Sequence, residues 1–102
     1  MLDTTNRYFI WLKKELTDWF APYPEAQVFV FGSSLRRDRF GDIDIGVKGE
    51  FDAERLPALR EHLTESTFPY IVDIVNFNTA KKSFTDNVLA QPVVWIKPSN
   101  LN

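Results

Sequence analysis

Apolar residues recur at helical spacing over the first twenty positions of the chain. A helix over residues 3–20 would place four of them on one core-facing stripe: Phe9, Leu12, Leu16 and Phe20. A neighbouring face would carry three aromatic residues: Tyr8, Trp11 and Trp19. Pro22 and Pro24 end this pattern, because proline lacks the amide donor and restrains the preceding residue. The sequence therefore predicts an N-terminal amphipathic helix with an aromatic flank.

Four short segments have the pattern of β-strands. Residues 28–31 form a continuous apolar run that ends at Gly32, which is typical of a strand buried on both faces. Residues 42–47 alternate strictly between polar and apolar, which predicts a half-buried strand. We expect a third strand at residues 70–75 and a last edge strand at residues 93–96.

Two further helices are expected between these strands. Residues 51–63 carry leucines at helical spacing, and the regular helix should begin near Pro57, which suits a first turn. Thr79 is expected to cap a short helix that runs through Phe84 and Val88. The resulting order (helix, strand, strand, helix, strand, helix, strand) predicts an α/β or α+β domain: a small mixed β-sheet with helices packed on it.

Length and charge narrow the function. The 102 residues are expected to form a single domain, residues 1–102, so a partner or a second copy must supply any further substrate-binding surface. Twelve Lys+Arg against 14 Asp+Glu give a net charge of −2, which does not favour an extended nucleic-acid footprint. The absence of cysteine excludes disulfides and zinc–thiolate sites. No signal peptide or membrane span is predicted, and we expect a cytoplasmic protein.

Asp42 and Asp44 are the first candidates for chemistry. Side chains alternate along a strand, so these two carboxylates should share one face while Ile43 and Ile45 enter the core. Their mutual repulsion would be relieved by a divalent cation, and Mg²⁺ prefers carboxylate oxygens together with water or phosphate. The alternative is a solvated strand face with incidental acids.

Asp73 lies inside an apolar strand pattern, where an unpaired charge is costly to bury. If the third strand lies beside the second, Asp73 would join Asp42 and Asp44 in one acidic cluster. Three carboxylates can hold two metal ions for in-line attack at phosphorus. The alternative is that Asp73 caps or pairs with a nearby arginine, which its strand context disfavours.

The end of the first strand offers a phosphate site. A Gly at that point lets backbone amides approach an anion, and Ser33 can donate to a phosphate oxygen. Arg36, Arg37 and Arg39 add positive charge nearby. The alternative is an ordinary Gly-Ser turn with solvated arginines, but a phosphate loop followed by Asp-x-Asp and then by a third Asp forms an ordered set.

The segments FGSSLR, GDIDIGV and YIVDIV resemble the signature of the minimal nucleotidyltransferases of the DNA polymerase beta superfamily. The resemblance covers residues 28–75 and implies a nucleotidyltransferase fold like the polymerase beta palm. It also implies that Gly32 and Ser33 bind the β- and γ-phosphates of a nucleotide. Arg36 matches the arginine that commonly follows the Gly-Ser pair.

The same resemblance implies the roles of the acids. Asp42 and Asp44 would ligate two Mg²⁺ ions, with Mn²⁺ as the alternative, and Asp73 would ligate the catalytic ion and help to deprotonate the acceptor hydroxyl. The implied reaction transfers a nucleoside monophosphate, AMP from ATP, to a hydroxyl and releases pyrophosphate. The sequence departs from the family in two places: only eight residues separate Ser33 from Asp42, and Arg37 replaces a small residue.

Small members of this family resemble the antitoxin half of a two-protein module whose partner is a helical HEPN-type toxin. The resemblance implies that the transferase modifies a tyrosine of that toxin. Trp11 and Trp19 suit a partner interface, although they could equally pack within the protein. The alternative function is a binding module that keeps the fold and neutralises its partner by contact alone. His62, on a charged helix, is expected to be a solvated surface residue.

Overall fold

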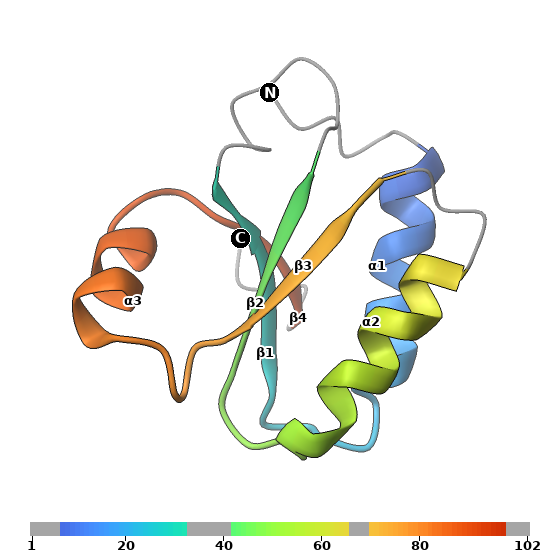
Figure 1. Cartoon of the computed structure of the whole chain (residues 1–102), viewed down its shortest axis with the longest axis horizontal. Coiled ribbons are helices and arrows are strands. Elements are labelled where there is room, and N and C mark those ends of the chain that lie inside the picture. The colour runs from blue at the N-terminus through green and yellow to red at the C-terminus, as the bar shows by residue number, and fades with distance from the viewer. Residues whose placement is uncertain (1–6, 33–41, 66–69, 98–102) are drawn as a thin grey trace.

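A computed structural model describes residues 7–32, 42–65 and 70–97 of the chain. Its elements occur in the predicted order (Figure 1): α1 (Arg7–Trp19), β1 (Gln27–Phe31), β2 (Ile43–Lys48), the 3₁₀ helix η2 (Ala53–Arg55), α2 (Leu56–Glu65), β3 (Val72–Asn76), α3 (Lys82–Leu89) and β4 (Val94–Lys97). The described part of the chain is thus a mixed domain of strands and helices, which confirms the predicted fold class.

The strands form one mixed sheet in the order β3-β2-β1-β4. β1 is antiparallel to both β2 and β4, whereas β2 and β3 are parallel. Parallel neighbours need a crossover connection, and α2 lies in the connection between these two strands. β4 occupies an edge of the sheet, as predicted for the last strand.

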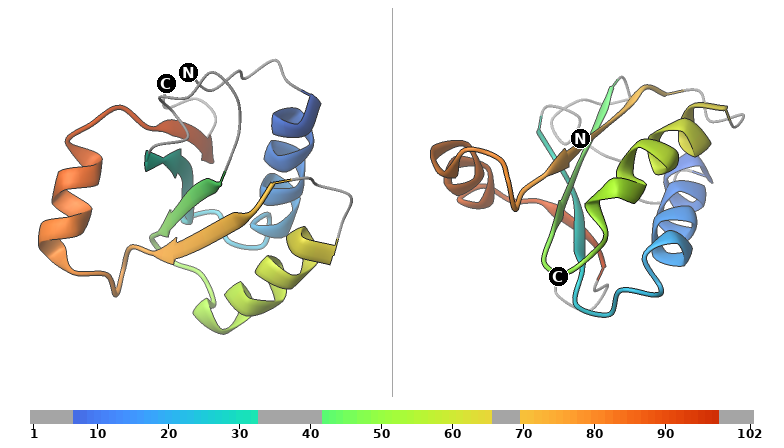
Figure 2. Two further views of the ribbon diagram at one scale, coloured as in Figure 1. Left: turned by 45° about the horizontal axis from the view of Figure 1, so that its top comes forward. Right: turned by 60° about the horizontal axis from the view of Figure 1, so that its bottom comes forward.

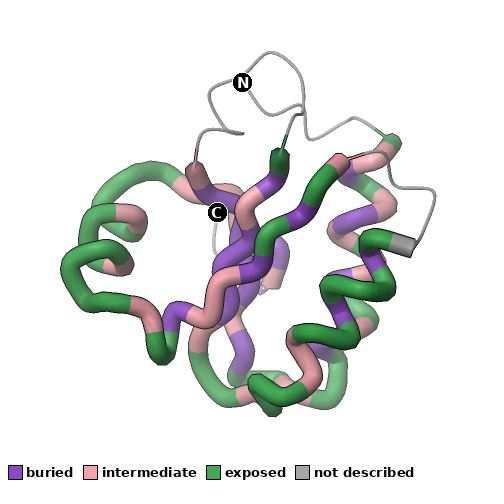
Figure 3. The backbone as a smooth tube through the Cα atoms, in the orientation of Figure 1, coloured by how far each residue is buried: buried purple, intermediate pink, exposed green. Residues whose placement is uncertain are grey.

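The main hydrophobic core lies between the sheet and the pair α1 and α2, which are side by side on one side of the sheet (Figures 1 and 2). The stripe predicted on the first helix is buried in this core: Phe9, Leu12, Leu16 and Phe20. The sheet contributes alternate residues of its two central strands: Val28, Val30, Ile43, Ile45 and Val47. Figure 3 shows this concentration of burial in the strands. The period-2 and period-3.6 patterns thus meet in one apolar layer.

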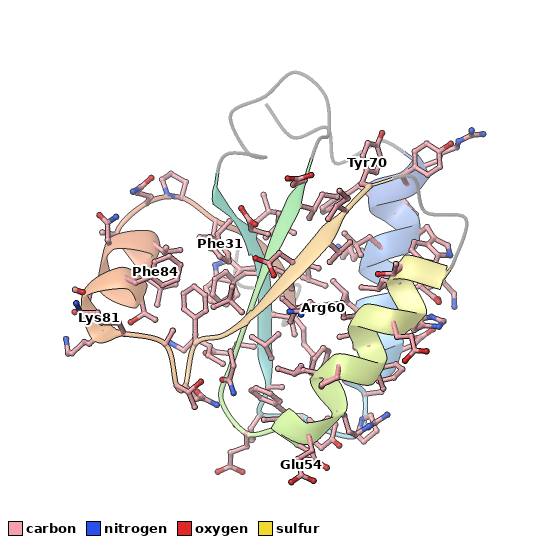
Figure 4. The ribbon with its side chains drawn as sticks, viewed as in Figure 1. Phe31, Glu54, Arg60, Tyr70, Lys81 and Phe84 are labelled. Atoms are coloured by element: carbon pink, nitrogen blue, oxygen red, sulfur yellow. The ribbon has the colours of Figure 1, made fainter. Side chains whose placement is uncertain are left out.

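The opposite face of the sheet carries a smaller aromatic cluster of Phe29, Phe31 and Phe77. Helix α3 lies on this side and contacts the cluster through Phe84, whose ring centroid is 6.0 Å from that of Phe31 and 5.7 Å from that of Phe77 (Figures 2 and 4). Gly46 belongs to the same face, where a Cβ atom would collide with the Phe29 ring. Aromatic rings therefore cover part of this face of the sheet, and no residue of α3 is itself fully buried.

Two local predictions were wrong. Thr79 does not cap α3, since that helix begins at Lys82 and its N-cap residue Lys81 makes no side-chain cap hydrogen bond. Thr79 instead donates its hydroxyl to the carbonyl of Asn76, 3.4 Å away, in the turn after β3. β2 is more buried than a half-buried strand, because it is an interior strand and Gly46 is covered by aromatic rings.

Within residues 7–32, 42–65 and 70–97, none of the helices is long and apolar enough to cross a membrane.

Truncation of the core stripe is expected to destabilise the fold strongly. Leu12 is fully buried between α1 and the sheet, so Leu12→Ala should lower the free energy of unfolding by about 2–5 kcal/mol through lost burial and a residual cavity. Ile10 lies on the same helix but is 56% exposed, and Ile10→Ala should change that free energy by about 0.5 kcal/mol or less. Urea denaturation followed by circular dichroism measures both. Equal effects of the two substitutions would contradict the described orientation of α1.

Candidate functional site

The parallel pairing of β2 and β3 brings two of the predicted acids together. Asp44 is the register partner of Asp73, and the neighbouring pair is Ile43 with Val72. Ile43 and Val72 are buried in the main core. Asp44 and Asp73 directly follow them along the two strands, so their side chains project from the other face of the sheet. Asp73 is exposed, and Asp44 is intermediate in exposure. Two carboxylates from distant parts of the sequence therefore stand on adjacent strands and on the same face.

Asp42 stands at the end of the same strand pair. The amide of Ile43 donates to the carbonyl of Ile71 at 2.8 Å, so the pairing continues to the first residue of β2. Asp42 directly precedes that residue, is exposed, and by alternation shares the face of Asp44. The third strand thus lies beside the second, which was the condition under which Asp73 was expected to join Asp42 and Asp44 in one acidic cluster.

Gly32 directly follows β1 and lies against the Asp44 side chain. Its φ of 85° lies in the left-handed region, which side-chain-bearing residues rarely adopt. A Cβ atom at this position would lie 2.6 Å from Oδ2 of Asp44. Phe31, the preceding residue, is the register partner of Asp44. The glycine therefore leaves the space that the Asp44 carboxylate uses, next to the segment predicted to bind phosphate.

Ser33 and Arg36, with the rest of the connector between β1 and Asp42, lie outside the described residues. Their predicted contacts with nucleotide phosphates stay predictions.

Asp73 has an arginine partner, which the sequence interpretation had disfavoured. Nη2 of Arg60 lies 3.5 Å from Oδ1 of Asp73, and the two side chains are 53% and 62% exposed. β3 is an outer strand, so a charge at this position reaches solvent and is not buried as the apolar pattern suggested. Sequence reasoning missed Arg60, because an exposed arginine on an amphipathic helix carries no distinguishing signal.

The three acids fit a divalent cation by donor type, since carboxylate oxygens suit Mg²⁺. Asp44 and Asp73 are register partners on neighbouring strands, and Asp42 precedes the first residue of β2. The space left by Gly32 accommodates one of these carboxylates. In the part of the chain that the structure describes, no group of three or more Asp, Glu, His or Cys side chains is already arranged to hold a metal ion. The ligand roles of the three acids stay predictions.

Trp11 and Trp19 are partly buried and pack against the main core, which is the packing alternative to a partner interface. Trp19 stacks on His62 with ring centroids 6.0 Å apart, and the guanidinium of Arg55 lies 4.8 Å from the centroid of the Trp19 ring. His62 is exposed, as predicted, but Nε2 is 2.8 Å from Oε1 of Glu15. The contacts of His62 join α1 to α2, and that of Arg55 joins α1 to η2.

Comparison with known proteins identifies the class to which this fold and site belong. The family model described as "Polymerase beta, Nucleotidyltransferase" matches residues 14–99, which include every described residue of the candidate site. The chain therefore belongs to the polymerase beta nucleotidyltransferase family. This membership confirms the superfamily that the three motifs predicted.

A solved structure shares the fold. A chain in the "Crystal structure of the toxin-antitoxin with AMP-PNP" superposes with a TM-score of 0.61 at 22% sequence identity, over 82% of this chain and 71% of that chain. A search of curated proteins found no match.

Proposed function

We propose that this protein is a metal-dependent nucleotidyltransferase that transfers AMP from ATP to a hydroxyl group of a partner protein. The β2–β3 register carries the proposal, because it sets Asp44 beside Asp73 while Gly32 makes room for the Asp44 carboxylate. Family membership supports the reaction class. In this proposal, residues 1–102 act as one minimal nucleotidyltransferase domain in the cytoplasm.

The three acids divide the work. Asp42 and Asp44 would hold two divalent ions, Mg²⁺ or Mn²⁺, and Asp73 would also be a ligand of the catalytic ion. When bound, the ions would supply positive charge to the phosphates as negative charge develops. Asp73 would help to remove the proton of the acceptor hydroxyl. The hydroxyl oxygen forms a bond to the α-phosphorus, the bond between that phosphorus and the bridging oxygen breaks, and pyrophosphate leaves.

Gly32, Ser33 and Arg36 form the proposed phosphate-binding set. Gly32 supports this assignment by its place at the end of β1, directly against Asp44. Ser33 would donate to a phosphate oxygen, and Arg36 would add a cation in the fork geometry that suits phosphate. In this proposal, the nucleotide's phosphates lie beside the carboxylates.

The proposed acceptor is a tyrosine of a helical HEPN-type toxin, which would make this protein an antitoxin. The neighbour from a toxin-antitoxin crystal structure supports the role, and the AMP-PNP in that structure supports ATP as the donor. The net charge of −2 suits a protein acceptor better than a nucleic acid.

Calorimetric titration of ATP tests the nucleotide site directly. In Mg²⁺ the pure protein should bind ATP, and EDTA should abolish that binding because the proposed site needs a divalent ion to bind the phosphates. GTP, CTP and UTP titrated under the same conditions measure the preference for the base. The absence of binding for all four nucleotides in Mg²⁺ and in Mn²⁺ would contradict a working nucleotide site.

One observation favours the second candidate, a module that neutralises its partner by contact alone. Asp73 is already paired with Arg60, and no three-ligand group is formed among the described residues. Such a module would neutralise its partner equally well after the double change Asp42→Asn and Asp44→Asn. A transferase carrying that double change would fail to modify the partner and would leave it active.

A further inference from the structure

Arg60 joins helix α2 to the outer strand of the sheet at the third candidate carboxylate. Its Nη2 atom donates to the carbonyl of Ile74 at 3.1 Å and lies 3.5 Å from Oδ1 of Asp73. Figure 4 shows the side chain lying between α2 and β3. One nitrogen thus contacts both a backbone acceptor and the acid of the preceding residue.

The backbone contact explains why the guanidinium stays at this place. β3 is an outer strand of the described sheet, so its outward carbonyls have no neighbouring strand to bond. Leu59 and Leu63 anchor α2 in the main core and hold the helix beside this edge. Arginine carries several donors in a rigid planar fork, so it can satisfy the carbonyl and still present charge to Asp73.

The guanidinium and a divalent ion make opposite demands on Asp73. Asp73 stands next to Asp44 in the strand register, and the Arg60 charge offsets the repulsion between these carboxylates when no metal is bound. The oxygens of Asp73 are also the atoms that a divalent ion requires. A cation held beside them repels a second cation.

We propose that Arg60 is a positioning residue that holds Asp73 in the metal-free protein and weakens divalent-ion binding at that carboxylate. This role rests on the proposed function, since it assigns Asp73 to a metal. In this role, Arg60 lowers the availability of the Asp73 carboxylate as a metal ligand. The pair of contacts to Asp73 and Ile74 distinguishes Arg60 from an ordinary solvated arginine.

Mn²⁺ binding to the full chain, followed by electron paramagnetic resonance without nucleotide, tests this role. Arg60→Gln keeps a donor for the Ile74 carbonyl but removes the charge, and it should tighten Mn²⁺ binding about fivefold, as expected for a partly exposed pair. Arg60→Lys should remain near the wild-type affinity because the charge persists. Arg60→Met, which keeps the aliphatic stem, serves as a second neutral replacement if Arg60→Gln does not fold.

Arg55→Gln is the matched control. It makes the same change in net charge, but Arg55 packs on Trp19 and bonds to the Tyr23 hydroxyl, so Mn²⁺ affinity should not change. In an Asp73→Asn background, Arg60→Gln should also have no effect, since the carboxylate on which it acts is gone. A purely structural role of Arg60 would not produce this dependence on Asp73.

The outcomes separate this inference from the proposed function. If the wild type binds Mn²⁺ through Asp42 and Asp44 but Arg60→Gln has wild-type affinity, the role of Arg60 is overturned and the transferase site stands. Equal tightening by Arg60→Gln and Arg55→Gln would also overturn it, as an effect of net charge alone. If neither the wild type nor any variant binds Mn²⁺, the proposed function fails, and the role of Arg60 fails with it.

Discussion

Asp44→Asn is expected to reduce nucleotidyl transfer by about a thousandfold, the scale on which loss of one preorganised charge-stabilising group acts. Asparagine matches the shape of Asp44 but lacks the negative charge that the proposed divalent-ion site needs. The measurement is transfer of a radiolabelled α-phosphate from ATP to the partner protein at saturating Mg²⁺. Circular dichroism checks that the variant is folded.

Asp86→Asn serves as the control for this substitution. Asp86 is an exposed acid on α3 that pairs with Lys82 one turn away, so its neutralisation makes the same charge change on a different element from the candidate acids. It should leave the transfer rate unchanged. Wild-type activity in Asp44→Asn would refute the assignment of this acid to the metal site and would favour the contact-only module.

Gly32→Ala is expected to weaken ATP binding by at least about tenfold, which corresponds to a loss of about 1.4 kcal/mol of binding free energy. The new methyl group would stand 2.6 Å from Oδ2 of Asp44 and force that carboxylate away from the end of β1. The positive φ adds about 1–2 kcal/mol of backbone strain to the folded state. ATP titration in Mg²⁺ and urea denaturation measure the two effects separately.

Gly49→Ala separates the site effect from the strain. Gly49 also has a positive φ of 91°, and a Cβ atom there would collide with the backbone oxygen of Glu25. Its amide donates to Asn78 Oδ1 at 3.1 Å. Gly49 follows the last residue of β2, whereas Asp42 precedes the first, so the two lie at opposite ends of the strand. Gly49→Ala should therefore destabilise the protein while the folded fraction keeps its ATP affinity. Equal losses of affinity in both glycine variants would contradict a specific role for Gly32.

The sequence was sufficient to predict the order of the elements because the spacing of apolar residues in each segment follows from which of its side chains are buried. The stripe on α1 and the apolar run of β1 are both buried in the structure, and the regular part of α2 begins at Leu56, next to the expected Pro57. Thr79 was misplaced because a hydroxyl can serve a turn as well as a helix end, and here it bonds to the Asn76 carbonyl. Local chemistry alone does not decide between those two uses.

The candidate site was only partly predictable. Spacing in the sequence placed Asp42 and Asp44 on one face, and apolar flanks placed Asp73 in a strand, but no local pattern reveals that Asp44 and Asp73 share a register position. The Arg60 contact is harder still to foresee, since it depends on how α2 lies against the edge of the sheet. Such contacts arise from tertiary packing between segments distant in sequence.

The parallel pairing of β2 and β3 also determines when Asp44 and Asp73 can become neighbours during folding. Asp44 and Asp73 are 29 positions apart, and they meet only after the crossover through α2 is complete, a non-local step that tends to be slow. Val72 and Ile74, which flank Asp73 and are buried, select the correct alignment, because a slip of one residue would expose both and bury the acid. The burial of these two apolar residues therefore favours the correct register, and Asp44 and Asp73 become neighbours only in a correctly folded chain.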